Sequence, residues 1–440
     1  MTLPIYADAR PVAIIEADRE GPRIDYQETW RQDGDRFPIS LSMPLGTSRH
    51  GPEVAVPWLM NLLPEGEPLR AMTYALGVGR DDILGLIAET GRDLAGALTI
   101  GSPRSNARPG YRKIDNPGDL ERIIAELPSK PFLVGDEGVS MSLAGAQQKL
   151  PVGLDGDGIA IPINGASSTH ILKPDNPRLA GSVQNEALCM VLARRCGLVV
   201  APVLTGRAGD RSYLLVERYD RAGAGVDVRR LHQEDFCQAL GRPPAAKYEH
   251  NGSGVRGPAL ADMFALVREH MTARDINRLL DAVIFNIAVG NVDSHAKNYS
   301  ILLTAQQPEL APLYDLMSGL DWANITQSHA QDVGGQRRGR HIYGRHWRRM
   351  ADACGLSKPG VIRRLDGLIT RLLAELPAAV EEVGAMSAGG REMAAMFAAS
   401  IGDRARLVQA HAQEEGDQAE PDASDPEGAR LGGEVSPSVG

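Results

Sequence analysis

The 440-residue chain is poor in aromatic side chains, in cysteine and in long apolar runs, and each shortage excludes some classes of protein. Phe, Trp and Tyr make up only 5% of it, so Leu, Val, Ala and Ile must fill its cores. No uncharged apolar run is long enough to cross a bilayer, so we expect no membrane insertion. The first residues lack a basic start followed by an apolar core, so we also expect no signal peptide.

Cysteine is scarce, and the four that occur form no CxxC pair (Cys189, Cys196, Cys237 and Cys354). Most of them lie in apolar, helix-like surroundings, which favours buried thiols and a cytoplasmic location. The net charge of −9 is concentrated at one end, because residues 414–440 hold eight acidic residues and one arginine. The remaining 46 basic and 48 acidic residues nearly balance, so local patches must determine the partners of the folded part.

The length predicts two or three compact units. We expect an α/β unit over residues 1–105, with a one-sided strand where apolar residues alternate from Phe37 to Leu45. No catalytic group stands out there, so this unit is interpreted as a scaffold. Residues 106–130 resemble a linker with one boundary helix, and the acidic tail over residues 412–440 is expected to be disordered.

The most informative stretch runs from Asn291 to Asn298 and places Asp293 five positions before Asn298. A capping box at residues 272–275 predicts a buried helix that ends near Gly290, and an extended segment follows over residues 299–304. Asp315 comes eleven residues later. Buried helix, polar loop, strand and second aspartate is the order in which a protein kinase places its catalytic base, its metal-binding asparagine and its second metal ligand.

Upstream, residues 138–153 form a loop of small residues that can bring main-chain N–H groups close to phosphate oxygens. The loop matches neither standard glycine-rich phosphate motif, so a solvated turn remains an alternative. Lys173 ends a short strand, and Glu186 lies in the first turns of the next helix. A kinase uses such a lysine on phosphates, although a surface lysine and a carboxylate favoured by the helix dipole give the same pattern.

The chemistry of these side chains fits phosphoryl transfer. Asp293 can accept the proton of an acceptor hydroxyl, and Asn298 and Asp315 offer the hard oxygen ligands that Mg²⁺ prefers. Lys297 is placed to contact the γ-phosphate, whereas His295 is expected to be structural.

Taken together, the chain resembles the HipA family of toxin-type serine/threonine kinases. The resemblance is carried by segments spread over nearly the whole sequence: 38–45, 61–64, 91–97, 142–149, 169–174, 185–186, 215–220, 233–238, 293–298 and 314–318. It implies an α/β, two-lobed kinase-like fold, with a small N-terminal α/β subdomain, an N-lobe over residues 131–223 and a mostly helical C-lobe over residues 224–411.

The resemblance also implies roles for single residues. Asp293 and Lys173 would be catalytic, with Glu186 in support, and Asn298 and Asp315 would hold Mg²⁺. The residues implied to bind ATP are Ala144, Gly145, Ala146, Gln147, Gln148, Lys149, Lys173, Glu217, Arg218, Tyr219, His295, Lys297, Asn298 and Asp315. Ser142 matches the position that family members autophosphorylate to inactivate themselves, with Ser140 as a weaker second site.

The implied partners are a HipB-like helix-turn-helix antitoxin, DNA reached through that antitoxin, and a protein substrate in translation such as an aminoacyl-tRNA synthetase. Two other functions stay open: a catalytically weak corepressor with the same fold, and a small-molecule kinase. The basic segment from Arg337 to Arg349 is interpreted as a solvated helix flank, with contact to nucleic acid as the alternative.

Overall fold

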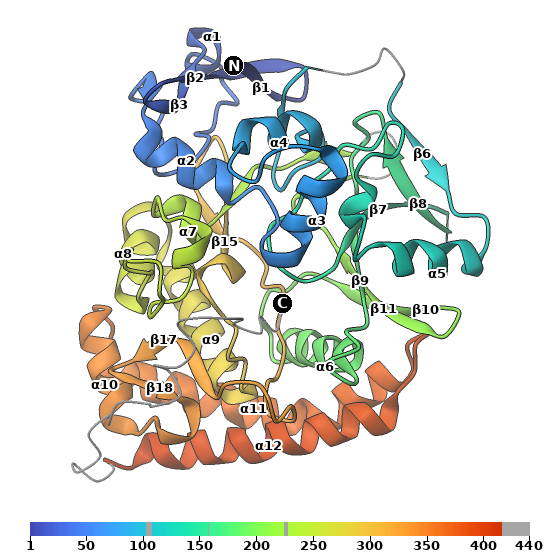
Figure 1. The fold of residues 1–440 in the computed structure, drawn as a ribbon. Helices are drawn as coiled ribbons and strands as arrows, with labels where there is room; N and C mark the ends of the chain where they lie inside the picture. Colours follow the sequence, from blue (N-terminus) through green and yellow to red (C-terminus); the bar gives the residue numbers. More distant parts are fainter. Residues whose placement is uncertain (103–107, 157, 224–227, 416–440) are drawn as a thin grey trace. The chain divides into compact units, whose positions relative to one another are not determined.

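The structure is a computed structural model that describes residues 1–102, 108–156, 158–223 and 228–415 (Figure 1). The chain divides into two compact units. Unit 1 comprises Met1–Asp175, Ala201–Pro244 and Ser300–Ala311. Unit 2 comprises Asn176–Val200, Ala245–Tyr299 and the described part of Pro312–Gly440.

Unit 1 begins with an antiparallel sheet in the order β4-β3-β2-β1-β5. Its strands are β1 (Thr2–Ala7), β2 (Arg10–Asp18), β3 (Gly21–Tyr26), β4 (Arg49–His50) and β5 (Leu98–Ile100). Ile5, Ile15 and Ile24 are fully buried on one face of this sheet. The helices of this part are α1 (Glu28–Arg31), α2 (Pro52–Met60), α3 (Gly66–Leu76) and α4 (Ile83–Thr90). The sequence predicts two strands over residues 11–16 and 18–26 joined by a Gly-Pro turn. The two strands are confirmed, but Gly21 and Pro22 begin β3, so the turn lies just before them.

The strand expected from Phe37 to Leu45 was wrong, because this segment forms turns with one isolated bridge from Ser40 to Met43. The buried Tyr26 hydroxyl accepts a hydrogen bond from the Ile39 N–H (2.6 Å) and donates one to the Met43 carbonyl (2.7 Å). A side chain therefore satisfies main-chain groups that a neighbouring strand would otherwise pair. The alternating apolar residues still reach the core through Ile39 and Met43, which are fully buried.

A second sheet of unit 1 has the order β10-β11-β9-β7-β8-β6. Its strands are β6 (Gly110–Lys113), β7 (Leu150–Asp155), β8 (Gly158–Ile163), β9 (His170–Pro174), β10 (Val203–Ala208) and β11 (Arg211–Glu217). The helix α5 (Pro117–Glu126) is the predicted boundary helix. The sequence predicts an interior strand over residues 213–219. Strand β11 pairs with β9 on one side and β10 on the other, which confirms an interior strand, although it ends at Glu217.

The residue pattern from Leu231 to Leu240 predicts the start of a helical region, and this prediction was wrong in its first half. Strand β14 (Gln233–Asp235) pairs with β15 (Ser300–Leu302), and only then does α7 (Phe236–Ala239) begin. The remaining short strands of unit 1 are β12 (Arg221–Ala222), β13 (Arg229–Arg230) and β16 (Glu309–Leu310). Glu234 pairs with Ile301, 67 residues away, and this pairing overrides the local helical pattern. Sequence periodicity cannot predict such a distant partner.

Unit 2 is mostly helical, as expected for the later part of the chain. Its helices are α6 (Ser182–Arg195), α8 (Leu260–His270), α9 (Ala273–Val289), α10 (Gly344–Ala353), α11 (Lys358–Gly384) and α12 (Arg391–Gln413). The long helices α11 and α12 lie side by side (Figure 1) and bury Leu365, Leu372 and Phe397. The hairpin β17 (Ser328–Val333) and β18 (Gln336–Arg338) completes the unit.

All four cysteines are buried free thiols, as expected. Among the helices that the structure describes, none has the length and apolar character needed to cross a membrane. Most of the acidic tail predicted after residue 411 falls outside the described residues, since the description stops at residue 415.

Candidate active site

The loop from Asn291 to Asn298 begins where the buried helix α9 ends. Thr272 and Asp275 form the predicted capping box at the helix start. Gly290 closes the helix in the left-handed conformation at φ 71°, where a Cβ would lie 2.6 Å from the Leu320 side chain. Sequence signals therefore placed both ends of the element that carries the loop.

Three buried asparagine and tyrosine side chains fix the start of the loop. Asn291 donates from Nδ2 to Oδ1 of Asn286 (2.9 Å), and Asn286 donates to the Tyr299 hydroxyl (2.9 Å). Oδ1 of Asn291 then accepts from the Asp293 N–H (3.2 Å). Because these groups are buried and mutually bonded, the main chain at Asp293 has little freedom to move.

Asp293 lies at the centre of this loop and is 8% exposed. The Tyr248 hydroxyl donates a hydrogen bond to Oδ1 of Asp293, and the Tyr248 ring packs edge-on against His295 with centroids 5.1 Å apart. Asn298 donates from Nδ2 to the main-chain carbonyl of Asp293 (2.8 Å). The predicted base and the predicted metal ligand are thus joined directly, and Tyr248 orients the carboxylate.

Asp315 belongs to the same unit and adopts the left-handed conformation at φ 57°, which is uncommon for a residue other than glycine. The preceding Tyr314 donates from its hydroxyl to the Lys297 carbonyl (2.6 Å), one residue before Asn298. Three residues further on, Ser318 and Asn185 of α6 exchange two hydrogen bonds of 3.1 and 2.8 Å. The loop that carries Asp315 is therefore bonded to the loop from Asn291 to Asn298 and to α6, the buried helix that also carries Glu186.

The donor set of this unit fits a magnesium ion. Nδ2 of Asn298 is committed to the Asp293 carbonyl, so its amide presents Oδ1 as the atom for a cation. Asp315 adds a carboxylate, and Mg²⁺ prefers such oxygen ligands. His295 lies in the loop with its ring against Tyr248.

The predicted phosphate loop lies in unit 1, where the N-terminal subdomain holds it. Ser142 is fully buried, and its hydroxyl donates to the Leu62 carbonyl (3.0 Å). The main chain of Asp93 pairs with this segment on both sides: its N–H donates to Ser140 and its carbonyl accepts from the Ser142 N–H, each at 3.1 Å. Leu62 and Asp93 of the N-terminal subdomain therefore hold this loop in place.

Within the loop itself, Lys149 folds back and donates from Nζ to the Ala144 carbonyl (2.8 Å). The Gly145 carbonyl accepts from the Glu65 N–H (3.1 Å). At Gly145 φ is 102°, and a Cβ there would lie 2.6 Å from the Lys149 ammonium. The backbone conformation therefore favours glycine at this position, and a side chain there would also displace the Lys149 ammonium. Ala146, Gln147 and Gln148 are half-buried.

Lys173 is buried near the end of β9, paired with Leu214 of β11. The predicted adenine-binding segment, Glu217 to Tyr219, follows β11 directly. Its side chains are committed elsewhere, since the Tyr219 hydroxyl donates to Gln233 (2.8 Å) and Arg218 enters a buried ion network. Any nucleotide contact of Arg218 and Tyr219 would therefore come from their main-chain groups.

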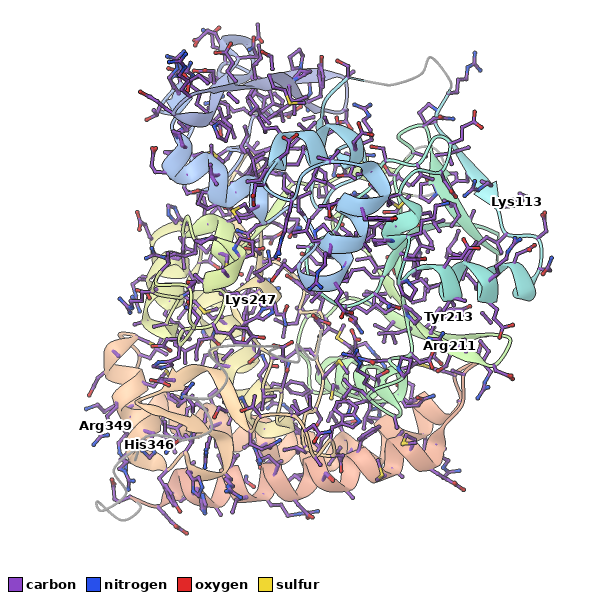
Figure 2. All side chains as sticks on the ribbon, viewed as in Figure 1. Lys113, Arg211, Tyr213, Lys247, His346 and Arg349 are labelled. Carbon is purple, nitrogen blue, oxygen red and sulfur yellow. The ribbon has the colours of Figure 1, made fainter. Side chains whose placement is uncertain are left out.

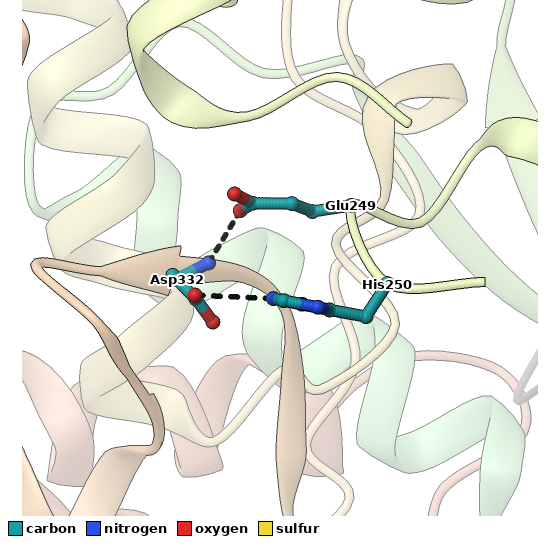
Figure 3. Close-up of side chains that lie close together, drawn as sticks. All are labelled: Glu249, His250 and Asp332. Atoms are coloured by element: carbon teal, nitrogen blue, oxygen red, sulfur yellow. Dashed lines mark hydrogen bonds and ion pairs between the residues drawn. The ribbon is translucent and has the colours of Figure 1, made fainter. Parts of the chain in front are cut away.

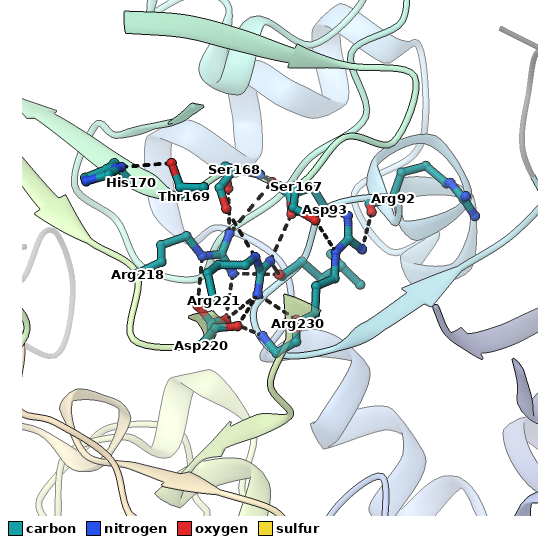
Figure 4. Close-up of polar contacts among 12 residues, drawn as sticks. Arg92, Asp93, Ser167, Ser168, Thr169, His170, Arg218, Asp220, Arg221 and Arg230 are labelled. Carbon is teal, nitrogen blue, oxygen red and sulfur yellow. Dashed lines mark hydrogen bonds and ion pairs between the residues drawn. The ribbon is translucent and has the colours of Figure 1, made fainter. Parts of the chain in front are cut away.

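That network places three arginines around two carboxylates (Figure 4). Arg218 binds Asp220 through two hydrogen bonds of 2.9 and 2.7 Å, and Arg221 donates to Asp93 (2.9 Å). Arg230 lies 3.7 Å from Asp93. Burial opposes ionisation of Asp93 and Asp220, but the arginine charges outweigh it and lower the pKa of both carboxyl groups. Asp93 thus links the phosphate loop, through its main chain, to the segment after β11, through its side chain.

The basic segment interpreted as a helix flank forms β18, a 3₁₀ turn and α10, with His346 and Trp347 buried. Arg349 is exposed on α10 (Figure 2). Part of the positive charge is paired locally: Arg348 with the Glu415 carboxylate, and Arg337 with Asp332 at 3.8 Å.

The Pro, Gly and Asn residues between Gly241 and Gly257 predict a surface loop, so nothing in the sequence singles out Tyr248. That expectation was wrong for part of the loop, since Ala246 and Lys247 are buried and the Tyr248 hydroxyl bonds to Asp293. No local pattern marks a single tyrosine in such a loop. Asp93 was also missed, although it lies within one of the segments that carried the family resemblance.

Comparisons with known proteins agree with this arrangement. The HipA N-terminal domain model matches residues 3–101, and the HipA-like C-terminal domain model matches residues 141–380. A putative kinase of Sinorhizobium fredii, Y4mE, is 37% identical over 92% of this chain and 98% of its own length. The serine/threonine-protein kinase toxin HipA of Shewanella oneidensis is 31% identical over 82% of this chain and 83% of its own.

A solved complex of HipA, HipB and operator DNA from Shewanella oneidensis MR-1 contains a chain of similar fold. The TM-score is 0.79 at 28% identity, over 93% of this chain and 96% of that one. The expected mixed α/β, kinase-like fold is therefore confirmed. From both domain matches and the extent of these similarities, the chain belongs to the HipA family.

Proposed function

We propose that this protein is an ATP- and Mg²⁺-dependent serine/threonine protein kinase and the toxin of a toxin–antitoxin pair. The observation that supports this most is the bonded set of Asp293, Asn298 and the Asp315 loop, which matches the base and metal ligands of a kinase. A catalytically weak corepressor would not need these side chains to be oriented in this way.

In the proposed reaction, Asp293 accepts or orients the proton of the substrate hydroxyl as that oxygen attacks the γ-phosphorus, the bond from the γ-phosphorus to the bridging oxygen breaks, and ADP leaves. Asn298 and Asp315 would hold Mg²⁺, which would neutralise charge on the phosphate oxygens. Lys173, Lys149 and the main chain of residues 144–148 bind the phosphates, and Lys297 contacts the γ-phosphate. Glu217 to Tyr219 bind the adenine, with Glu186 and His295 in support.

Ser142 is proposed as the autophosphorylation site that switches the kinase off, with Ser140 as the weaker second site. Both hydroxyls donate to main-chain carbonyls, Ser142 to Leu62 and Ser140 to Glu89. A phosphate dianion in the buried position of Ser142 would face a carbonyl oxygen and lose its solvation. Phosphorylation of Ser142 would therefore displace the phosphate loop from its contacts with the N-terminal subdomain.

The proposed partners follow from the relatives. A HipB-like helix-turn-helix antitoxin would bind the protein and bring it to operator DNA, because the similar Shewanella chain was solved with HipB and its operator. The substrate would be a translation component such as an aminoacyl-tRNA synthetase, and the protein would act in the cytoplasm.

Controlled expression followed by phosphoproteomics tests this proposal. Wild-type protein should arrest growth and add phosphate to serine or threonine of a translation protein, while Asp293→Ala should do neither at equal abundance. Co-expression of the antitoxin encoded beside this gene should relieve the arrest. Growth arrest by both forms, without any new phosphorylation site, would refute the kinase proposal.

A further inference from the structure

Outside the site described above, three side chains that could bind a metal ion lie close together (Figure 3). Glu249 and His250 lie in the loop before α8, and Asp332 lies on β17. His250 Nε2 is 3.0 Å from Oδ2 of Asp332, and the ligand atoms of all three side chains lie within 4.8 Å of one another. Each of these residues belongs to unit 2.

Two hydrogen bonds tie Glu249 to β17. The Glu249 N–H donates to the Ala330 carbonyl (3.0 Å), and Oε2 of Glu249 accepts from the Asp332 N–H (2.8 Å). This use of Oε2 leaves Oε1 of Glu249 as the atom that can bind a cation. Besides His250, two guanidinium groups act on these carboxylates: Arg337 lies 3.8 Å from Asp332, and the charge of Arg256 acts on Glu249.

We propose that Glu249, His250 and Asp332 bind one divalent transition-metal ion of the Zn²⁺ class. One imidazole nitrogen and two carboxylate oxygens form a donor set typical of zinc, with water completing the coordination, whereas Mg²⁺ and Ca²⁺ prefer oxygen ligands alone. The site is accessible from solvent, since the His250 side chain is 51% exposed and that of Asp332 is 26% exposed.

The position of the site connects it to the catalytic loop. Tyr248, which bonds to Asp293, directly precedes Glu249, and the Lys247 carbonyl accepts from the Ala296 N–H (3.1 Å). An ion that ties residues 249 and 250 to β17 would restrain this segment and keep the Tyr248 hydroxyl on Asp293. This regulatory consequence rests on the proposed kinase function, whereas metal binding itself does not.

Calorimetric titration of the full-length protein with Zn²⁺ tests the site directly. The Asp315→Ala background and excess Mg²⁺ would suppress binding at the catalytic metal position. We expect one Zn²⁺ per chain, with affinity reduced roughly tenfold or more by His250→Ala and by Glu249→Gln, because each removes a ligand. Glu249→Gln keeps an acceptor for the Asp332 N–H and so preserves the local fold.

The matched control is His270→Ala, which removes another half-exposed imidazole beside one carboxylate, Glu269 at 3.8 Å. It should leave Zn²⁺ affinity unchanged. Equal affinity in wild type and His250→Ala, or an equal loss in His270→Ala, would overturn the proposal.

A kinetic readout separates this inference from the proposed function. With a kinase substrate, chelation of Zn²⁺ should change kcat for wild type and leave His250→Ala unaffected. If the protein transfers no phosphate at all, the calorimetric result still decides whether the cation site exists.

Discussion

The side-chain amide of Asn298 donates a hydrogen bond to the main-chain carbonyl of Asp293 at 2.8 Å. This one contact sets the orientation of the proposed metal ligand and steadies the residue that carries the proposed base. The amide nitrogen faces the protein, and the amide oxygen is left for the cation.

Replacing Asn298 with Ala should remove one oxygen ligand of Mg²⁺ and lower kcat by about a hundredfold or more. The reason is that a less firmly bound metal ion stabilises the negative charge of the transition state less well. Asn298→Asp keeps an oxygen ligand but removes the N–H donor, so it should fall between wild type and Asn298→Ala. Initial rates over a Mg²⁺ series measure both effects. Equal Mg²⁺ dependence in all three proteins would contradict the assigned role.

Tyr248→Phe keeps the ring that packs against His295 and removes only the hydrogen bond to Asp293. A hydrogen bond to a charged group contributes about 1.5–3 kcal/mol, so kcat should fall roughly ten- to a hundredfold. The KM for ATP should stay within about twofold, because Tyr248 orients the base. A selective rise in KM would instead indicate that Tyr248 binds nucleotide.

Asp93→Asn should destabilise the protein by about 3–5 kcal/mol, because it leaves three buried arginines with a single carboxylate. Because the main chain of Asp93 also bonds to Ser140 and Ser142, this destabilisation should displace the phosphate loop and weaken ATP binding. Asp403→Asn removes an exposed ion pair with Arg406 and is the matched control, with an expected cost of at most about 1 kcal/mol. Urea unfolding and ATP titration measure the two effects, and similar results for both variants would contradict the coupling.

Glu234 provides a prediction for pH. Its burial raises the pKa of this carboxyl from 4.5 to about 8, and hydrogen bonds from Ser40 and the Leu41 N–H only partly oppose that rise. The folded chain keeps this proton up to about pH 8, whereas the unfolded chain releases it near pH 4.5. The contribution of Glu234 to stability is therefore present at low pH and is lost as pH rises through 8.

Glu234→Gln should remove this pH-dependent contribution, so the free energy of unfolding of the variant should decline less than that of wild type between pH 6.5 and 8. The difference is at most about 1.4 kcal/mol per pH unit. Below pH 6.5, burial of His232 and His329, whose pKa values fall to about 4, gives the opposite slope in both proteins. Parallel stability curves for the two proteins above pH 6.5 would show that Glu234 does not titrate in this window.

Local patterns predicted the parts of this molecule that local forces form. The capping box at Thr272 and the stop at Gly290 both act within a few residues, and the structure has both of them. The turns around Met43 and the strand β14 depend on Tyr26 and β15, which lie far away in sequence. Patterns over a short window contain no information about such partners.

The candidate site divides in the same way. Asp293, Asn298 and Asp315 could be predicted because their spacing is itself the signal. Tyr248 and Asp93 could not, because their roles come from hydrogen bonds across 45 residues to Asp293 and across 128 residues to Arg221. An isolated tyrosine or aspartate has the same local sequence whether or not such a partner exists.

Transfer of ³²P from γ-labelled ATP by purified protein tests the central claim most directly. Wild-type protein with Mg²⁺ should label itself at Ser142 and label a protein in a cell lysate, while Asp293→Asn, folded to the same extent by circular dichroism, should label neither. Labelling by Asp293→Asn at the wild-type rate, or no labelling by wild type at any Mg²⁺ concentration, would contradict the role of Asp293 as the base of a protein kinase.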